Sequence, residues 1–362
     1  MTHRQPTRRT FLKTSAAAGA AAVAGCATEI PEDKVTYTEA NSDPTSIDSV
    51  KQSTVDRVAA DPTDIPAPID RDEPATVEAE MTTREVTAEI EEGVTFDYMT
   101  FDGQVPGPMI RTRVGDTVEL TIHNAEDNDM PHNIDLHAVR GPGGGAEATM
   151  VAPGETQKVR FQVTYPGAFI YHCAVANLDY HISSGMFGII LVEPEEGLPE
   201  VDREFYLGQH EVYTDGEAGQ EGHHTFDMGA MAREDPTYVL INGEKYAITP
   251  NKYADMTAET GETARVFYCV GGPNLTSSFH PIGSVWDEVY TQGGLGGTPQ
   301  TNIQTTPVMP GSTAIATMHF PVPGPVKLVD HALSRVARKG ALAVLDVQGD
   351  PNPDVFDPDP DF

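Results

Sequence analysis

Pro166-Gly167-Ala168-Phe169-Ile170-Tyr171-His172 has a counterpart far along the chain in Pro323-Gly324-Pro325-Val326-Lys327-Leu328-Val329-Asp330-His331. In both stretches a Pro-Gly pair, which is typical of a turn, leads through a largely apolar run to a histidine. A further Pro-Gly pair precedes each by 13 residues, at Pro153-Gly154 and at Pro310-Gly311. Such self-similarity predicts two copies of one structural unit.

The runs between these turns favour β-strands. Thr117–Ile122, Lys158–Val163 and Thr313–Met318 are alternating or rich in β-branched residues, and no long amphipathic pattern predicts a helix. We therefore expect an all-β fold of two tandem β-sandwich domains. The two copies of the repeat meet near Pro194–Asp202, so we expect the first domain at residues 76–196 and the second at residues 197–348.

The start of the chain is typical of an export signal. Thr7-Arg8-Arg9-Thr10-Phe11-Leu12-Lys13 is followed by a short run of small apolar residues, and paired arginines resemble a twin-arginine signal over residues 1–26. Val23-Ala24-Gly25-Cys26 resembles a lipobox, in which the cysteine is lipidated after cleavage. We expect an extracytoplasmic protein that a lipid on Cys26 anchors to the cell membrane; simple cleavage of the signal is the alternative.

Two acidic segments flank the predicted domains. Residues 27–75 are rich in Asp, Glu, Thr, Ser and Pro, which predicts a flexible linker because such a composition buries too little apolar surface. Residues 349–362 alternate Asp and Pro and are expected to form a disordered tail.

The charge of the chain is strongly negative. Asp and Glu number 55 against 23 Lys and Arg, which gives a formal net charge of -32. A duplex nucleic-acid partner requires a basic surface, so we expect none. Self-repulsion of this size opposes folding, but at molar salt the Debye length falls to ~3 Å and the repulsion is screened. The charge thus predicts adaptation to a saline medium.

Four residues in the first copy have the side chains that bind a blue copper ion. His132, Cys173, His181 and Met186 supply two imidazoles, a thiolate and a thioether, which is the ligand set of a type 1 copper site. The last three are close in sequence, as expected of one loop that folds around one ion.

The spacing of neighbouring histidines predicts a second metal. His132 and His137 are five residues apart, and His172 adjoins Cys173, so on regular strands the members of each pair point to opposite faces. His137 and His172 would share the second face, and His331 is the natural third ligand. Three imidazoles leave an open position for a substrate.

Two further residues are candidates for proton transfer. Asp135 has the same parity as His137, so its carboxylate should point toward the second metal, where it could relay protons. His280 occurs in the second copy where the first has its His132–His137 stretch, and could be a second proton donor.

These ordered motifs resemble the copper-containing, nitric-oxide-forming nitrite reductases, which have two cupredoxin domains and belong to the multicopper oxidase superfamily. The resemblance covers about residues 76–348. It implies two tandem cupredoxin domains, each a Greek-key β-sandwich, in a homotrimer that reduces nitrite to nitric oxide and water in denitrification. A small blue copper protein or a cytochrome would donate the electron.

The resemblance also assigns the site residues. It implies one type 1 copper per subunit on His132, Cys173, His181 and Met186. It implies one type 2 copper on His137, His172 and His331, the last from a neighbouring subunit. Asp135 and His280 match the active-site pair of the family, and Ile282 matches the residue that shapes the pocket above the metal.

Two other functions have to be weighed. A laccase-like multicopper oxidase would build a trinuclear cluster from His-x-His pairs, but none of the 12 histidines has another two positions away. A non-enzymatic blue-copper electron carrier would need neither the second set of histidines nor a second domain. Of the remaining candidates, Cys269 is expected to be a buried apolar residue, and His223-His224 to lie in a solvated loop.

Overall fold

The computed structural model describes residues 53–360. The predicted export signal with Cys26, and residues 27–52 of the predicted acidic linker, lie outside this part. The strands are β1 (Ser53–Thr54), β2 (Thr76–Glu91), β3 (Val94–Phe101), β4 (Ile110–Arg113), β5 (Thr117–Asn124), β6 (Asp135–Leu136), β7 (Thr156–Gln162), β8 (Gly167–His172), β9 (Phe187–Glu193), β10 (Arg203–Val212), β11 (Gly222–His224), β12 (Tyr238–Ile241), β13 (Met256–Glu259), β14 (Thr263–Gly272), β15 (Ser277–Ile282), β16 (Trp286–Thr291), β17 (Gln300–Ile303), β18 (Thr306–Val308), β19 (Ser312–His319), β20 (Gly324–Asp330) and β21 (Leu342–Gln348). The helices are the 3₁₀ turn η1 (Pro142–Gly145), α2 (Leu178–Ser183), α3 (Met228–Ala232) and α4 (Ser334–Lys339).

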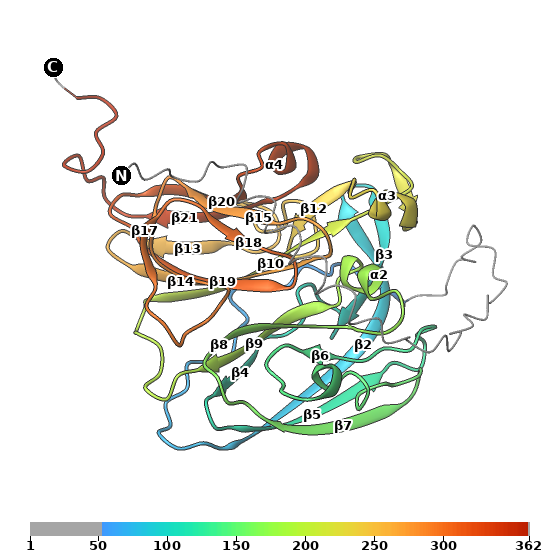
Figure 1. Ribbon diagram of the computed structural model, residues 1–362. Coiled ribbons are helices and arrows are strands. Elements are labelled where there is room, and N and C mark those ends of the chain that lie inside the picture. The colour runs from blue at the N-terminus through green and yellow to red at the C-terminus, as the bar shows by residue number, and fades with distance from the viewer. Residues whose placement is uncertain (1–52, 361–362) are drawn as a thin grey trace, which may run out of the picture. The chain divides into compact units, whose positions relative to one another are not determined.

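The strands form four sheets, which confirms the predicted all-β class (Figure 1). The first half of the chain forms two sheets. One has the strand order β3-β2-β5-β7, with β11 added beside β3 and β1 beside β2, and the other has the order β4-β9-β8-β6. The second half supplies β12-β10-β14-β19-β16-β17 and β13-β21-β20-β15-β18. Each half is thus built from two sheets, as a β-sandwich requires.

The two halves share one topology. β5 pairs with β2 in parallel and with β7 in antiparallel orientation, and β14 pairs with β10 and β19 in the same way. β9 lies between parallel β4 and antiparallel β8, just as β21 lies between β13 and β20. His172 ends β8 and His331 directly follows β20, so the two histidines occupy equivalent positions. The repeat seen in the sequence is therefore a structural duplication.

Hydrophobic alternation explains how the sheets pack. In β5 the inward side chains Val118, Leu120 and Ile122 are fully buried, while the residues between them are partly exposed. β9 is buried along its whole length. One of its faces packs in a core that also contains Phe267 and Ile315 of the second half. This shared core makes the described residues 53–360 part of one compact unit.

Residues 53–75 do not form the flexible linker that their composition predicted. Val58, Ala59 and Ala60 are buried, and the backbone of Val105 bonds with both Val58 and Ala60. Farther on, the Arg71 guanidinium binds the buried carboxylate of Asp116. These few apolar and paired residues are sufficient to fix a segment whose average composition is polar.

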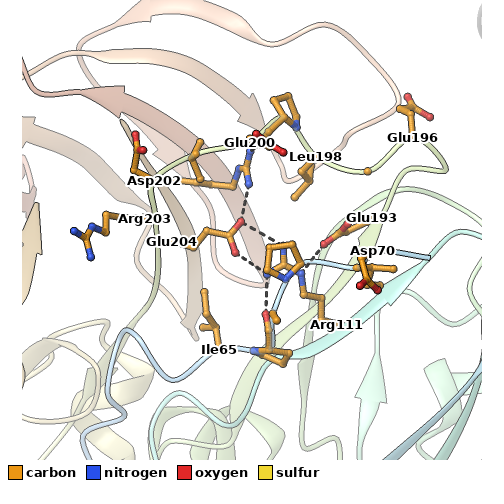
Figure 2. A pocket seen from close by; sticks show the side chains of 18 residues that line it. Ile65, Asp70, Arg111, Glu193, Glu196, Leu198, Glu200, Asp202, Arg203 and Glu204 are labelled. Atoms are coloured by element: carbon orange, nitrogen blue, oxygen red, sulfur yellow. Dashed lines mark hydrogen bonds and ion pairs between the residues drawn. The ribbon is translucent and has the colours of Figure 1, made fainter. Parts of the chain in front are cut away.

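A buried ion network joins the two halves beside this segment. Arg111 in β4 donates to Glu193 Oε1 at 2.5 Å and to Glu204 Oε2 at 2.6 Å, and Arg265 donates to Glu204 Oε1 at 2.6 Å. Figure 2 shows Arg111 between the two carboxylates, at a cavity of about 670 Å³. Because each charge has an opposite partner, the network can remain buried between β4, β9, β10 and β14.

The end of the described chain carries little structure. Residues 349–360 contain turns and mostly exposed side chains, and Asn352 Nδ2 donates to the carbonyl of Pro321 at 3.3 Å. Within residues 53–360, no helix has the length and apolar character that crossing a bilayer requires.

Candidate metal centres

Three of the predicted blue-copper ligands meet in a fully buried cluster in the first half. Cys173 Sγ lies 3.9 Å from His132 Nδ1 and 3.6 Å from His181 Nδ1. The three side chains have no exposed surface, and their ligand atoms lie within 4.8 Å of one another. Met186 is also fully buried, and its carbonyl accepts a bond from the Cys173 backbone at 3.2 Å. The ring nitrogens that face the sulfur are the atoms that a copper ion would need.

The segment between β8 and β9 carries three of these residues. Cys173 directly follows β8, His181 lies in α2, and Met186 directly precedes β9. The end of α2 is attached to β10 of the second half: Ser183 Oγ donates to the carbonyl of Glu211 at 2.7 Å, and His210 Nδ1 donates to the carbonyl of Ser183 at 2.9 Å. The second half therefore holds the helix that presents His181.

Burial sets the protonation of this cluster. It raises the pKa of the Cys173 thiol to about 11, and it lowers the pKa of His181 to about 3, with a smaller contribution from His132. The imidazole is thus neutral, with a lone pair to offer, whereas the thiolate needs a nearby cation. A bound copper ion supplies that positive charge, so the donor set fits the metal.

Two neighbours of this cluster were not predicted from the sequence. Asn133 Oδ1 lies 3.6 Å from Cys173 Sγ and accepts a bond from the Ala174 backbone at 2.7 Å. Glu85, which is 3% exposed, lies 3.0 Å from His132 Nε2. Burial alone would raise the pKa of Glu85, but bonds from His132 and from two backbone N–H groups lower it overall. Asn133 directly follows the candidate ligand His132, so its place in the sequence could have indicated that it lies beside the cluster.

A second, more exposed cluster contains Asp135, His137 and His172. His137 Nε2 lies 3.1 Å from His172 Nε2, and His172 Nδ1 donates to the Cys173 carbonyl at 2.9 Å. With the proton on Nδ1, the lone pair of His172 lies on Nε2, the nitrogen that faces His137. Burial and His172 lower the pKa of His137, although Asp135 opposes this. Two imidazoles and a carboxylate can bind a copper ion here.

The separation of the two clusters agrees with the parity argument, but the strand geometry assumed for it is wrong. Only Asp135–Leu136 is a strand, and His132 forms an isolated bridge with Val151. Asn133 and Ile134, between the bridge and this strand, belong to no strand, so the regular geometry assumed for residues 132–137 is absent. Asp135 pairs across with His172 in the β6–β8 register, which brings its carboxylate to the histidines.

His331 and His280 form a separate pair in the second half. Their ring centroids lie 5.0 Å apart. The His331 backbone donates to the Ser278 carbonyl at 2.7 Å, and His280 Nδ1 donates to the Gln304 carbonyl at 2.5 Å. His331 is exposed, and Ile282 in the same sheet is 39% exposed. In the described part of one chain, His331 is not in the cluster of His137 and His172.

Cys269, His223 and His224 lie outside both clusters. Cys269 is fully buried, as expected. His223 and His224 do not form a solvated loop, because they belong to β11, which pairs with β3. His224 is 3% exposed and its Nε2 donates to the Gln220 carbonyl at 2.8 Å. His223, the preceding residue of the same strand, is exposed, so only one of the two histidines faces the protein.

A duplicated two-sheet β-sandwich that encloses a Cys-His cluster, with a methionine in the same core and a histidine cluster beside it, defines a two-domain copper protein of the cupredoxin type. Comparison with known proteins agrees. Residues 82–197 match the multicopper oxidase family.

Relatives make the assignment narrower. The chain is 47% identical over 302 residues to the copper-containing nitrite reductase of Neisseria meningitidis serogroup B, covering 83% of this chain and 76% of that protein. It is 34% identical to the enzyme of the same name from Cereibacter sphaeroides, with 78% and 79% coverage. The copper nitrite reductase structure from Nitrosomonas europaea superimposes with a TM-score of 0.68 at 34% identity, covering 77% of this chain and 96% of that one. The chain belongs to the family of copper-containing nitrite reductases, and copper is its cofactor.

The same comparisons bear on export. Residues 5–25 match the signal sequence of the twin-arginine translocation pathway, which confirms the predicted signal type and supports export across the cytoplasmic membrane.

Proposed function

We propose that this protein reduces nitrite to nitric oxide and water, with the consumption of one electron and two protons for each nitrite. Membership of the family supports this reaction. The observation in the structure that carries it is the adjacency of Cys173 in the buried cluster and His172 in the exposed one. An electron that enters the buried cluster can pass to the second through neighbouring residues.

The ligands of the two coppers follow from the clusters. His132, Cys173, His181 and Met186 would hold a type 1 copper, and His137 and His172 would provide two ligands of a type 2 copper. Copper supplies one-electron redox chemistry at both positions and Lewis acidity at the second. The protein keeps water from the buried cluster, while the partial exposure of the second gives nitrite access.

The third ligand of the type 2 copper would come from another subunit. His331 is exposed and separate from His137 and His172, as expected of a residue that faces a neighbouring chain. A closed homotrimer would bring His331 of one subunit to His137 of the next, so each of three identical interfaces would contain one site. His280, whose ring packs against that of His331, would then face the same pocket, together with Ile282 two residues farther along β15.

Proton delivery would involve Asp135 and His280. Asp135 lies beside the two imidazoles of its own subunit, and His280 would arrive with His331. The His280 ring is oriented by its bond to the Gln304 carbonyl, which leaves Nε2 to hold a proton for the substrate. Two proton carriers match the two protons that the reaction consumes.

The finer surroundings of the enzyme are also proposals. We propose cupredoxin domain boundaries at residues 76–196 and 197–348, with a small blue copper protein or a cytochrome as electron donor. Lipidation of Cys26 would anchor the exported protein to the membrane. The net charge of -32 would suit it to a saline medium.

Spectroscopy together with turnover tests this function. Copper-loaded protein should show two EPR signals, a thiolate-to-copper visible band, and nitric oxide production with a reduced donor. His331→Ala should abolish nitrite turnover but keep the visible band. A single copper signal without turnover would instead favour the electron carrier, and turnover that survives His331→Ala would refute the two-site assignment.

A further inference from the structure

Glu85 has buried surroundings that are unusual for a carboxylate. It lies in β2 on the same face as Met81 and Thr83, toward the core that also contains Cys173 and Met186. Beyond Glu85 the pattern shifts, and Val86 packs in the core that both halves share. β2 thus passes from one core to the other, and Glu85 is the last side chain directed at the copper cluster.

Three N–H groups converge on this carboxylate. Oε1 accepts from His132 Nε2 at 3.0 Å and from the Met130 backbone at 2.9 Å, and Oε2 accepts from the Asp129 backbone at 3.1 Å. A carboxylate that only accepts bonds is the ionised form. The buried negative charge therefore acts directly on the imidazole of His132.

The bond to Glu85 also fixes which nitrogen of His132 can bind a metal. With its proton on Nε2, His132 has its lone pair on Nδ1, and Nδ1 is the atom that faces Cys173 Sγ at 3.9 Å. His181 differs, because its buried Nε2 has no hydrogen-bond partner among residues 53–360. Of the two imidazoles, only that of His132 therefore has a hydrogen bond to a carboxylate among the described residues.

We propose that Glu85 is a positioning residue of the type 1 copper site, which orients His132 and lowers the reduction potential of the metal. The inference rests on the proposed role of His132 as a ligand. A buried carboxylate that accepts the Nε2 proton of the imidazole makes Nδ1 a stronger electron donor to the metal. It therefore stabilises the oxidised ion more than the reduced one. A lower potential favours transfer of the electron onward to the nitrite site.

A structural role for Glu85 would have different consequences. The carboxylate also anchors the loop at residues 128–130, and it could serve that loop alone. Asn128 provides a matched control, since its side chain accepts from the Glu85 backbone at 2.8 Å and donates to the Thr83 carbonyl at 2.9 Å. Asn128→Ser would loosen the same loop and leave the bond between Glu85 and His132 in place.

The test compares full-length, copper-loaded Glu85→Gln, Asn128→Ser and unchanged protein by spectroelectrochemical titration of the thiolate-copper band. Loss of one charge-assisted bond should shift the electron equilibrium about tenfold toward the reduced copper, a rise of ~59 mV for one electron. Glu85→Gln should also lose type 1 copper faster to a chelator. Asn128→Ser should change neither quantity. An unchanged potential in Glu85→Gln, or an equal shift in both variants, would overturn the proposal.

Two arrangements keep the test decisive. If Glu85→Gln does not load copper, Glu85→Asp replaces it in the test. Its shorter side chain weakens the bond to His132, so the reduction potential should still rise. An unchanged potential in Glu85→Asp would contradict the proposed role of Glu85. Failure of the proposed function would appear elsewhere, as a missing thiolate band or absent nitric oxide production in the unchanged protein. The two failures are thus distinguishable.

Discussion

The imidazole of His331 packs edge-on against that of His280, with 5.0 Å between the ring centroids. His137 and His172 form an equivalent edge-on pair in the other half, with centroids 5.1 Å apart. Both pairs occupy corresponding places in the duplicated fold, at the ends of β8 and β20. If a type 2 copper binds to three of these four histidines, a second chain has to bring the pairs together.

Mixed trimers should reveal this arrangement. His137→Ala and His331→Ala should each abolish nitrite turnover. When the two variants are co-expressed in equal amounts, random assembly should restore about a quarter of the unchanged activity, because one interface in four joins an intact His137 to an intact His331. Nitric oxide production per type 1 copper measures the recovery. A site within one chain would give none.

Gly144 should be necessary for the position of Asp135. Its φ is 56°, and a Cβ there would overlap Asp135 Oδ1 and lie 2.9 Å from Asp135 Cγ. Gly144→Ala should displace the carboxylate and lower nitrite turnover on the order of 10- to 100-fold, with an altered pH profile and an unchanged visible band.

Gly143 is the matched control for this substitution. Its φ of 54° imposes the same left-handed strain on alanine, but its Cβ would meet only Ala146 at an ordinary 3.6 Å. Gly143→Ala should therefore lose stability without the catalytic defect. Equal turnover in the two variants would show that Asp135 tolerates displacement.

The sequence contained enough local information for the fold and for most residues of the two candidate metal clusters. Pro-Gly turns and alternating runs such as Thr117–Ile122 act within a few residues, and a Cys-His-Met series has few other uses. Glu85 had no such signal. Its burial depends on Asp129 and Met130, more than 40 residues away, which supply the N–H groups that it accepts.

The role of Gly144 could not be read for a similar reason. Gly143-Gly144-Gly145 looks like an ordinary flexible turn, and only the folded chain brings it against Asp135. The packing of residues 53–75 was missed because average composition concealed Val58, Ala59 and Ala60. Local patterns predict elements, whereas contacts between distant segments decide which polar residues become buried.

Asp116 should stabilise the fold in a pH-dependent manner. Burial alone would raise its pKa, but bonds from Arg71 and from the Ala75 and Arg113 backbones lower it overall, from 3.8. A depressed folded pKa gives stability that is present above about pH 4 and disappears as the pH falls through the folded value. Asp116→Asn should cost about 2 kcal/mol at pH 7 and less at pH 2, where Asp116 becomes protonated in a growing share of the molecules.

Urea unfolding at both pH values measures this difference. Asp72→Asn, in an exposed position of the same segment, should leave the unfolding free energy nearly unchanged at either pH. A loss in Asp116→Asn that stayed constant with pH would mean that Asp116 acts through its shape and not its charge.

Low ionic strength should destabilise the whole protein. The chain has an excess of 32 negative charges, whose mutual repulsion extends over a Debye length of ~10 Å at 0.1 M salt but only ~3 Å at 1 M. Dialysis into dilute buffer should therefore lower the melting temperature and nitrite turnover, and sedimentation should show whether a trimer dissociates at the same time.

Sodium chloride and potassium chloride should restore both properties equally, because screening depends on ionic strength and not on a bound cation. Recovery with only one of the two salts would point to a specific ion site, and full activity in dilute buffer would remove the case for a saline habitat.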